Sequence, residues 1–293
     1  MRNIYDLKRE IQDLKNVRDV IATLERISAS YIPALRSHLE ILEEYAEGNR
    51  RIFRKLGAKQ TDVQEDDDIS QSLVVVFSTD HGLVGGLNSR LIERVVEHVR
   101  DNPKDHVIVF GEKGKDLMRI SGIHPAAIFS ALTDKPSIDE LREFFDQFFS
   151  TSDIAYRRVT VLAPRFVSVL EQSVEPSVVW PVYSDHNGGV EAGHSGTVEE
   201  QPNEESYAFV DPSGKRVAEF LIARMVRLTM YEKALGAKLS EHAARMTAMA
   251  DAGKSAGKIV SNLEHQYFKA RQYTITKRLS EVFSAKQSLK LDL

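Results

Sequence analysis

The sequence contains no cysteine. Disulfides, thiol catalysis and thiolate metal sites are therefore excluded. It also lacks a long apolar run, since no stretch approaches the ~18 consecutive apolar residues that suggest a membrane span. The N-terminus is charged every few residues and has no apolar core of the kind that a signal peptide needs. We therefore expect a soluble, cytosolic protein, or one that is held at a membrane only through its partners.

The chain also has no excess of positive charge. The 293 residues include 39 Lys and Arg against 43 Asp and Glu, which gives a net charge of -4. Proteins that bind nucleic acid are usually basic, so we expect no nucleic-acid partner. The length is sufficient for one large or two small domains.

Proline is absent from the C-terminal part of the chain, because all nine prolines lie between Pro33 and Pro212. Proline breaks helix interiors by a steric clash and by the loss of a donor, so residues 213–293 can form one uninterrupted helix. Asp211 and Pro212 mark its start, with a capping carboxylate before a proline suited to the first turn. Such a helix would be roughly 110 Å long at 1.5 Å per residue, so much of it should project and need a partner.

Apolar residues recur about every 3.5 residues along this C-terminal segment, which is the period of a left-handed coiled coil. The N-terminal segment carries a similar apolar seam, with a kink expected at Pro33. We therefore expect two helices, within residues 1–57 and 211–293, to wind together as a long antiparallel coiled coil.

The middle of the chain, residues 70–210, reads as an α/β domain that follows an acidic linker. The expected strands are 72–78, 106–110, 126–129, 158–163, 167–174, 177–183 and 206–210, and the expected helices are 87–101, 112–121 and 137–150. The early alternation of strands and helices predicts a parallel sheet, and the short connections between later strands predict an antiparallel extension. The fold class is therefore α/β, with a central Rossmann-like domain and a coiled coil of the terminal helices.

A glycine-rich turn follows the first expected strand and suggests a nucleotide site. Gly82, Gly85 and Gly86 are spaced G-x-x-G-G, whereas a dinucleotide turn needs G-x-G-x-x-G and a P-loop needs G-x-x-x-x-G-K-[ST]. No lysine is placed to reach a phosphate. We therefore assign Gly82, Gly85, Gly86 and Asn88 to a tight strand-to-helix turn with close backbone packing, and we expect no cofactor.

Three sets of polar residues invite a catalytic or metal-binding interpretation. Asp80 and His81 could serve acid/base chemistry, but no nucleophile accompanies them, so we interpret them as a structural or surface pair. The histidines at 186 and 194 lie with Asp185 and Glu191 in the Gly-rich segment 184–206, which predicts a flexible surface loop rather than a metal site. We therefore expect no catalytic residues and no metal ligands.

Small residues make part of the C-terminal helix thin, and His242 lies on its apolar stripe. A lone histidine on such a face is usually a packed, hydrogen-bonded core residue. The small residues are consistent either with compact helix packing or with a narrow shaft that passes through another structure. The end of the helix, 267–288, is polar and basic, which suits both the helix dipole and an interaction surface.

Three blocks of sequence carry a resemblance to a known family. They are Val76-FSTDHGLVGGLN-Asn88, Val109-FGEKGKDLMRISG-Gly122, and Ser240-EHAARMTAMADAG with Tyr267-FKARQYTIT-Thr276. They resemble the gamma subunit, the central stalk, of F-type rotary ATP synthases, in which S-E-x-x-A-R-M-x-A-M and N-x-x-R-Q-x-x-I-T recur. The order of the blocks agrees, and the resemblance covers essentially the whole chain.

The resemblance implies a non-catalytic rotor shaft that couples transmembrane ion flow to ATP synthesis or hydrolysis. In the family, the coiled coil fills a hexamer of alpha and beta subunits, and the α/β foot contacts the epsilon subunit and the membrane c-ring. The contacts with the hexamer correspond to Arg271, Gln272, Thr276 and Arg278. The implied location is peripheral, at the cytoplasmic face of a bacterial cell membrane.

The chain departs from the family pattern at several positions. Asp19, Leu24 and Arg26 replace family residues of the first helix, Pro33 is unusual within it, and Arg278 stands where the family commonly has Glu. These departures fit a divergent member, such as a gamma-like subunit of a sodium-type or non-synthase rotary ATPase. Two further alternatives are a nucleotide-binding α/β enzyme with coiled-coil arms and a coiled-coil scaffold outside any motor.

Overall fold

The computed structural model describes residues 4–55, 71–149, 156–180 and 214–291. The chain divides into two compact units. We call Ser28–Arg245 the α/β unit, and Met1–Ile27 with Met246–Leu293 the helix-pair unit. Helices α1 (Ile4–Lys55) and α5 (Gly214–Leu291) each contribute a segment to both units.

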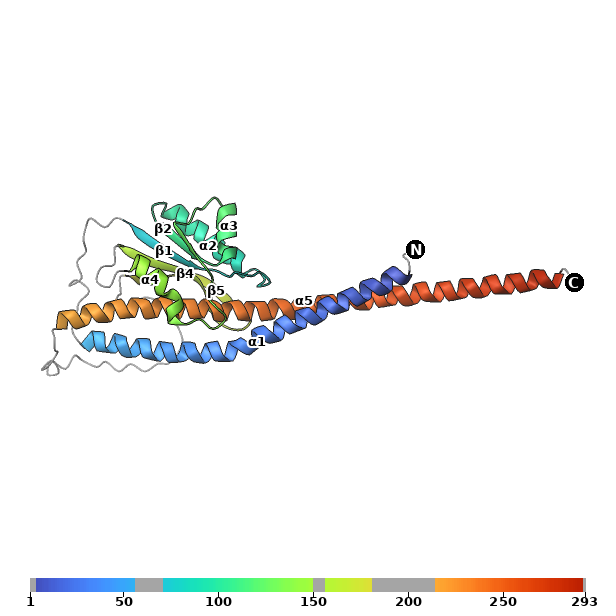
Figure 1. Ribbon diagram of the computed structural model, residues 1–293, viewed down its shortest axis with the longest axis horizontal. Helices are drawn as coiled ribbons and strands as arrows, with labels where there is room; N and C mark the ends of the chain where they lie inside the picture. The colour runs from blue at the N-terminus through green and yellow to red at the C-terminus, as the bar shows by residue number, and fades with distance from the viewer. Residues whose placement is uncertain (1–3, 56–70, 150–155, 181–213, 292–293) are drawn as a thin grey trace. The chain divides into compact units, whose positions relative to one another are not determined.

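A five-stranded sheet lies at the middle of the α/β unit (Figure 1). Its strands are β1 (Ser72–Phe77), β2 (His106–Phe110), β3 (Ala127–Phe129), β4 (Arg158–Phe166) and β5 (Gln172–Trp180), in the order β3-β2-β1-β4-β5. Strand β1 is parallel to β2 and β4, β2 is parallel to β3, and β5 is antiparallel to β4. The expected parallel sheet with an antiparallel extension is confirmed.

The expectation of two strands at 167–174 and 177–183 is wrong. Residues 167–171 form a turn, in which the Ser168 N–H donates to the Glu171 carbonyl (2.9 Å), and β5 then continues without a break. Pro176 lies within β5, opposite Leu162 on an edge strand, where a missing N–H can face away from the ladder. The strand expected at 206–210 lies outside the described residues.

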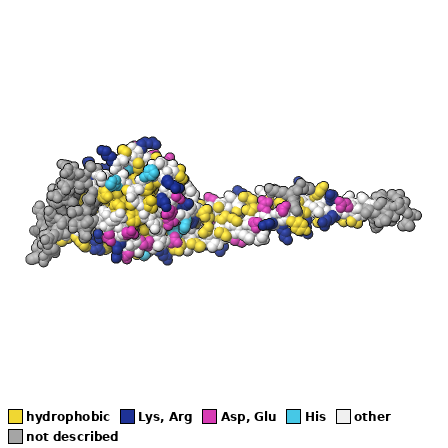
Figure 2. Space-filling model, turned by 45° about the horizontal axis from the view of Figure 1, so that its top comes forward, with side chains coloured by type: hydrophobic (Ala, Val, Ile, Leu, Met, Phe, Trp, Pro, Cys, Tyr) yellow, Lys and Arg dark blue, Asp and Glu magenta, His cyan; other side chains and the backbone are white. Residues whose placement is uncertain are grey.

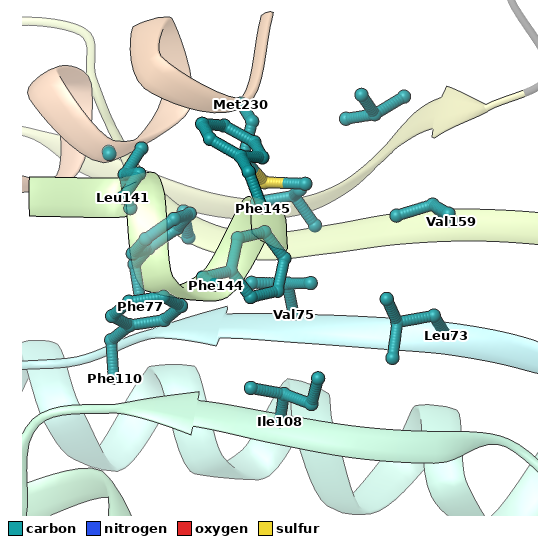
Figure 3. Packing of buried hydrophobic residues seen from close by; sticks show 14 of the residues in the cluster. Leu73, Val75, Phe77, Ile108, Phe110, Leu141, Phe144, Phe145, Val159 and Met230 are labelled. Carbon is teal, nitrogen blue, oxygen red and sulfur yellow. The ribbon is translucent and has the colours of Figure 1, made fainter. Parts of the chain in front are cut away.

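Helices cover both faces of the sheet. On one face α2 (Leu87–Asp101) and α3 (Glu112–Ile120) pack on Val74 and Val76, and on the other the 3₁₀ helix η2 (Ile138–Leu141), α4 (Arg142–Phe148) and α5 pack on Leu73, Val75 and Phe77. Figure 3 shows Phe144, Phe145 and Met230 gathered over this second face. The central strands read as continuous apolar runs because both of their faces are buried.

Helices α1 and α5 run antiparallel within each unit. In the α/β unit Leu35 packs on Leu235 and Leu239, and further along α1 the Tyr45 hydroxyl is bonded to Arg224. In the helix-pair unit Leu7 and Ile11 pack with Val260 and Leu263, while Lys15 pairs with Glu264 at 2.7 Å and Ile21 lies beside Gly253. Residues later in α1 thus contact residues earlier in α5, as antiparallel helices require.

The prediction of one uninterrupted C-terminal helix is also confirmed, since α5 runs through 78 residues. Pro33 is accommodated inside α1. The residues expected to cap α5, Asp211 and Pro212, lie outside the described residues.

Candidate functional site

The glycine turn between β1 and α2 is held together by one side-chain bridge. The Thr79 hydroxyl donates to the His81 carbonyl (2.7 Å), and the Asn88 amide donates to Thr79 Oγ1 (2.8 Å). Gly85 has a φ of +56°, in the left-handed region that glycine adopts without strain. The turn therefore depends on a Thr–Asn bridge across its ends and on a backbone angle that suits Gly85.

Close packing of glycine occurs elsewhere than expected. A Cβ added at Gly82 or Gly86 would meet no atom within 4 Å, whereas one added at Gly114 would lie 2.3 Å from Ser78 Oγ. Gly111 is equally confined, and its φ is +99°. The glycines that permit close approach to the segment following β1 are therefore those at the start of α3, not Gly82 or Gly86 of the glycine turn.

The first backbone N–H groups of α3 are bonded to the segment that follows β1. That of Glu112 donates to Asp80 Oδ1 (3.0 Å), and the next two donate to the Thr79 carbonyl (3.0 Å) and the Ser78 hydroxyl (2.9 Å). Such N–H groups are the ones that bind phosphate at helix N-termini. Because the chain itself occupies them, this helix end is not open to a nucleotide phosphate.

Of the other polar candidates, the structure describes Asp80 and His81. Asp80 is used as the cap of α3, and the His81 side chain is exposed. The histidines at 186 and 194 lie outside the described residues. Within the four described ranges, no cluster of three or more His, Cys, Asp or Glu side chains is arranged to hold a metal ion.

Glu241 is the centre of a buried ionic cluster on α5. It is 4% exposed, and its two carboxylate oxygens accept hydrogen bonds from Lys238 Nζ (2.8 Å) and Arg245 Nη2 (2.6 Å). Burial by itself raises the pKa of Glu241, but the two cations outweigh burial and hold that pKa below its ordinary value. The carboxylate therefore stays charged at neutral pH.

The same stretch of α5 is fastened to the carboxyl ends of the parallel strands. Ser240 Oγ lies 3.3 Å from the Pro164 carbonyl of β4, within hydrogen-bond distance. Ala244 packs against Val84 of the turn after β1 and against Leu87 at the start of α2. The block S-E-x-x-A-R, read from the sequence as a family motif, thus joins α5 to the sheet.

Glu140 of η2 is a second carboxylate near Lys238. It accepts hydrogen bonds from the Thr133 N–H and hydroxyl (2.8 Å each) and from the Ser137 N–H (2.9 Å). Burial raises the pKa of Glu140, but these bonds and the Lys238 ammonium lower it overall. The loop that precedes η2 is therefore closed around a charged carboxylate.

His242 lies beside the ionic cluster and is 2% exposed. Its ring stacks on Tyr31 of α1, with 4.7 Å between the ring centroids. Within the described residues neither ring nitrogen has a hydrogen-bond partner, although Asp134 Oδ1 lies 3.4 Å from Nε2. Burial is the main cause that lowers the pKa of His242. The residue is packed as expected, but the expected hydrogen bond is not found.

The end of α5 in the helix-pair unit has a different character. Its apolar side chains at one side are 49% to 69% exposed, and they are Phe268, Ile275, Leu279, Val282 and Phe283. They share a side because a helix advances about 100° per residue. Figure 2 shows hydrophobic side chains reaching the surface of the helix pair among charged ones. An exposed apolar stripe of this kind indicates a protein partner.

The residues expected to contact a partner hexamer lie along this stripe. Gln272 falls inside it, Thr276 falls on one border, and Arg271 and Arg278 fall on the other. All four side chains are exposed. An apolar centre with a polar and cationic border has the composition of a protein interface. Among the described helices, none has both the length and the apolar character required to cross a membrane.

Three residues around Glu241 and His242 were not indicated by the sequence patterns. Lys238 carries a local signal, because a lysine three residues before Glu241 at an inward helix position suggests a buried pair. Tyr31 and Asp134 carry none, since they come from segments far from His242 in the sequence. Only the tertiary fold brings them together.

Comparison with known proteins places the chain in a family. A family model described as ATP synthase matches residues 3–289. The ATP synthase gamma chain of Xanthomonas campestris is 27% identical over 292 residues, covering 95% of this chain and 96% of the relative. That of Rubrobacter xylanophilus is 28% identical over 297 residues, covering 99% of each.

A solved structure has the same fold. A chain of the rotor of the Euglena gracilis mitochondrial ATP synthase, in rotational state 1, aligns with a TM-score of 0.64 at 17% identity. The alignment covers 93% of this chain and 98% of that one. The family match extends over nearly the whole sequence, and the antiparallel helices and the sheet agree with the fold of that rotor chain. The chain therefore belongs to the ATP synthase family.

Proposed function

We propose that the chain is the gamma chain of an F-type ATP synthase. It serves as the central rotor shaft, which couples rotation driven by transmembrane ion flow to ATP synthesis or hydrolysis at the alpha and beta subunits. The observation that carries the proposal is the exposed apolar stripe at the end of α5. A helix that continues for 78 residues and leaves such a stripe uncovered needs other chains around it.

In this proposal the terminal helices and the central domain have different roles. Residues 1–57 and 211–293 form the coiled-coil shaft, and its end lies inside the hexamer of alpha and beta subunits. Residues 70–210 form the foot, which meets the epsilon subunit and the c-ring. As the shaft turns, it presents different faces to the catalytic sites in succession, so that each site passes through its states in order.

Four residues form the proposed contact with the hexamer. Arg271 and Arg278 lie on the cationic border of the stripe, where a guanidinium can form paired hydrogen bonds with a carboxylate of a partner. Gln272 and Thr276 offer hydrogen bonds beside the apolar centre. An apolar stripe permits sliding, whereas the polar border gives discrete contacts that can transmit force.

The chain itself carries no catalytic residues in this proposal. The closed N-terminus of α3 and the glycine spacing of the turn support a fold that does not bind nucleotide. The complex would lie at the cytoplasmic face of a bacterial cell membrane, and the chain would be attached there only through its partners.

Copy number tests the shaft role directly. Native mass spectrometry of the complex purified through this chain should give one copy for every three alpha–beta pairs. A central position allows only one shaft in each hexamer. Three copies per complex, or recovery without alpha and beta subunits, would contradict the proposal and favour a scaffold outside any motor.

The contact residues are tested by the double variant Arg271→Ala with Gln272→Ala. We expect weaker assembly or a lower ratio of pumped ions to hydrolysed ATP, measured in membrane vesicles. The matched control is Lys277→Ala with Ser284→Ala, which also removes one cation and one polar group but lies on the opposite side of α5. Equal coupling in the two variants would show that the stripe border is not the contact.

A further inference from the structure

His242 is enclosed by charged groups that are already engaged. On its own helix it is flanked by Lys238 and Arg245, and each of these cations bonds to one oxygen of Glu241. The Glu241 carboxylate therefore has no oxygen without a cation partner. A positive charge on the His242 ring would be attracted by Glu241 and Asp134 and repelled by Arg245 and Lys238, and the loss of water on burial is the largest influence against it.

The other elements around His242 add few favourable contacts for a charged ring. The loop after β3 contributes Asp134, whose side chain is 52% exposed, and Lys135, whose Nζ lies 5.7 Å from the Tyr31 ring centroid. Glu140 of η2 attracts the Lys238 ammonium electrostatically, and its carboxylate accepts a hydrogen bond from the Thr133 N–H of the preceding loop. Helix α1 contributes the Tyr31 ring, which is shared between His242 and Lys135.

Burial and the two neighbouring cations favour the neutral ring, and together they outweigh the attraction of Glu241 and Asp134 for a charged one. A cation can gain from the face of a tyrosine, but Lys135 already lies over the Tyr31 ring. A ring that is 2% exposed also loses nearly all contact with water, which disfavours a charge. The stack on Tyr31 is the contact through which this ring joins α1 to α5 inside the α/β unit.

We propose that His242 and Tyr31 form a proton-operated latch between α1 and α5. The neutral His242 ring holds α1 through the stack, and protonation loosens that hold and draws Asp134 toward the ring. The latch is a property of the α/β unit by itself, so it does not depend on the rotor role or on any partner.

The sign of the pH dependence follows from burial. The pKa of His242 is lowered from its ordinary value of 6.5, so the unfolded or opened state takes up the proton more readily. The stabilising contribution is complete above pH 6.5 and is lost as the pH falls through the lowered value. Acidification should therefore open the start of the α1 segment in this unit.

The test uses the full chain and the variant His242→Phe, which keeps an aromatic ring on Tyr31 but cannot be protonated. Hydrogen exchange of residues 28–35 is measured between about pH 8 and pH 5, the range in which histidine titrates, and corrected for the intrinsic rate. We expect protection to fall on acidification in the wild type and to stay constant in the variant. The same acid response in both chains would overturn the latch.

A second measurement does not depend on the folding of that variant. The titration of the His242 ring is followed by NMR in the wild type, in Asp134→Asn and in Asp139→Asn. We expect a wild-type midpoint below 6.5, a lower midpoint in Asp134→Asn because a favourable carboxylate is lost, and no change in Asp139→Asn. A wild-type midpoint at or above 6.5, or an unchanged midpoint in Asp134→Asn, would refute the latch.

Discussion

Two stretches of α5 share one backbone geometry and have opposite surroundings. Between residues 221 and 245, in the α/β unit, every side chain except Arg224 is at least partly buried. Between residues 271 and 284, in the helix-pair unit, every side chain except Thr274 is exposed. Both stretches nevertheless carry large apolar side chains at helical spacing. The apolar pattern therefore indicates that a helix has a partner, but not whether the partner belongs to the same chain.

Charge distinguishes the two stretches where apolar pattern does not. In the buried stretch, Glu241 is enclosed by two cations of its own helix. In the exposed stretch, Lys277 and Glu281 form an open pair at 3.9 Å. The first arrangement must be complete within the chain because buried charges need partners, whereas the second is satisfied by water.

The largest expected effect comes from removing the buried carboxylate. Glu241→Ala leaves Lys238 and Arg245 without their anion, and breaking a buried pair in this way costs about 3–5 kcal/mol. Urea unfolding can be followed by the fluorescence of the single tryptophan, Trp180, which lies in β5 of the α/β unit. We expect a lower free energy of unfolding by that amount.

The matched control is Glu281→Ala, which removes a carboxylate from the exposed pair of the same helix. We expect a change of no more than about 0.5 kcal/mol, because exposed ion pairs contribute little. If the two variants lost equal stability, the contrast between the buried and exposed stretches would be wrong.

A similar pair of changes separates folding from assembly. Leu239→Ala removes a fully buried side chain and should cost about 2–5 kcal/mol, measured by thermal unfolding of the chain with circular dichroism. Leu279→Ala, at a side chain that is 53% exposed, should leave this transition nearly unchanged but weaken binding to the alpha and beta subunits. Loss of assembly without loss of stability would mark the stripe as an interface.

The opposite result has a clear meaning. If Leu279→Ala unfolded the chain as strongly as Leu239→Ala, the stripe would be covered by the chain itself. If it changed neither stability nor assembly, the apolar stripe would not be the contact with the hexamer. Either result would remove the observation on which the proposed shaft role depends.

Most of the fold could be predicted from local sequence. The proline-free segment gave a single helix, and the β-branched run at Leu73–Phe77 gave a strand buried on both faces. The bounds of β5 were not predicted correctly, because the strand continues through Pro176, which only its position at the sheet edge makes tolerable. The local sequence pattern does not indicate whether a strand lies at the edge or in the middle of a sheet.

The buried cluster was less predictable for a physical reason. The family motif marks Ser240, Glu241 and Arg245, but not the partners that the fold supplies. Tyr31 and Asp134 approach His242 only after α1 and the loop after β3 have packed on α5. Contacts between segments so distant in the chain depend on topology rather than on spacing, so periodicity and motif matching do not find them.

The smallest expected effect is a pH dependence of the free energy of unfolding. It distinguishes the hydrogen-bonded carboxylate of Glu140 from the solvent-exposed carboxylate of Glu281. The pKa of Glu140 is lowered from its ordinary value of 4.5, so its stabilising contribution is present above pH 4.5 and is lost as the pH falls through the lowered value. Glu140→Gln should therefore reduce stability at neutral pH by about 0.5–1 kcal/mol, a modest amount because the side chain is exposed and screened.

The difference between Glu140→Gln and the wild type should then shrink as the pH is lowered below 4.5, because the wild type loses the same contribution when its carboxylate is protonated. Urea unfolding by Trp180 fluorescence at a series of pH values measures this convergence. Glu281→Gln controls for the removal of a carboxylate from an open ion pair. A constant difference across the series would show that the hydrogen bonds from Thr133 and Ser137 do not depend on the charge of Glu140.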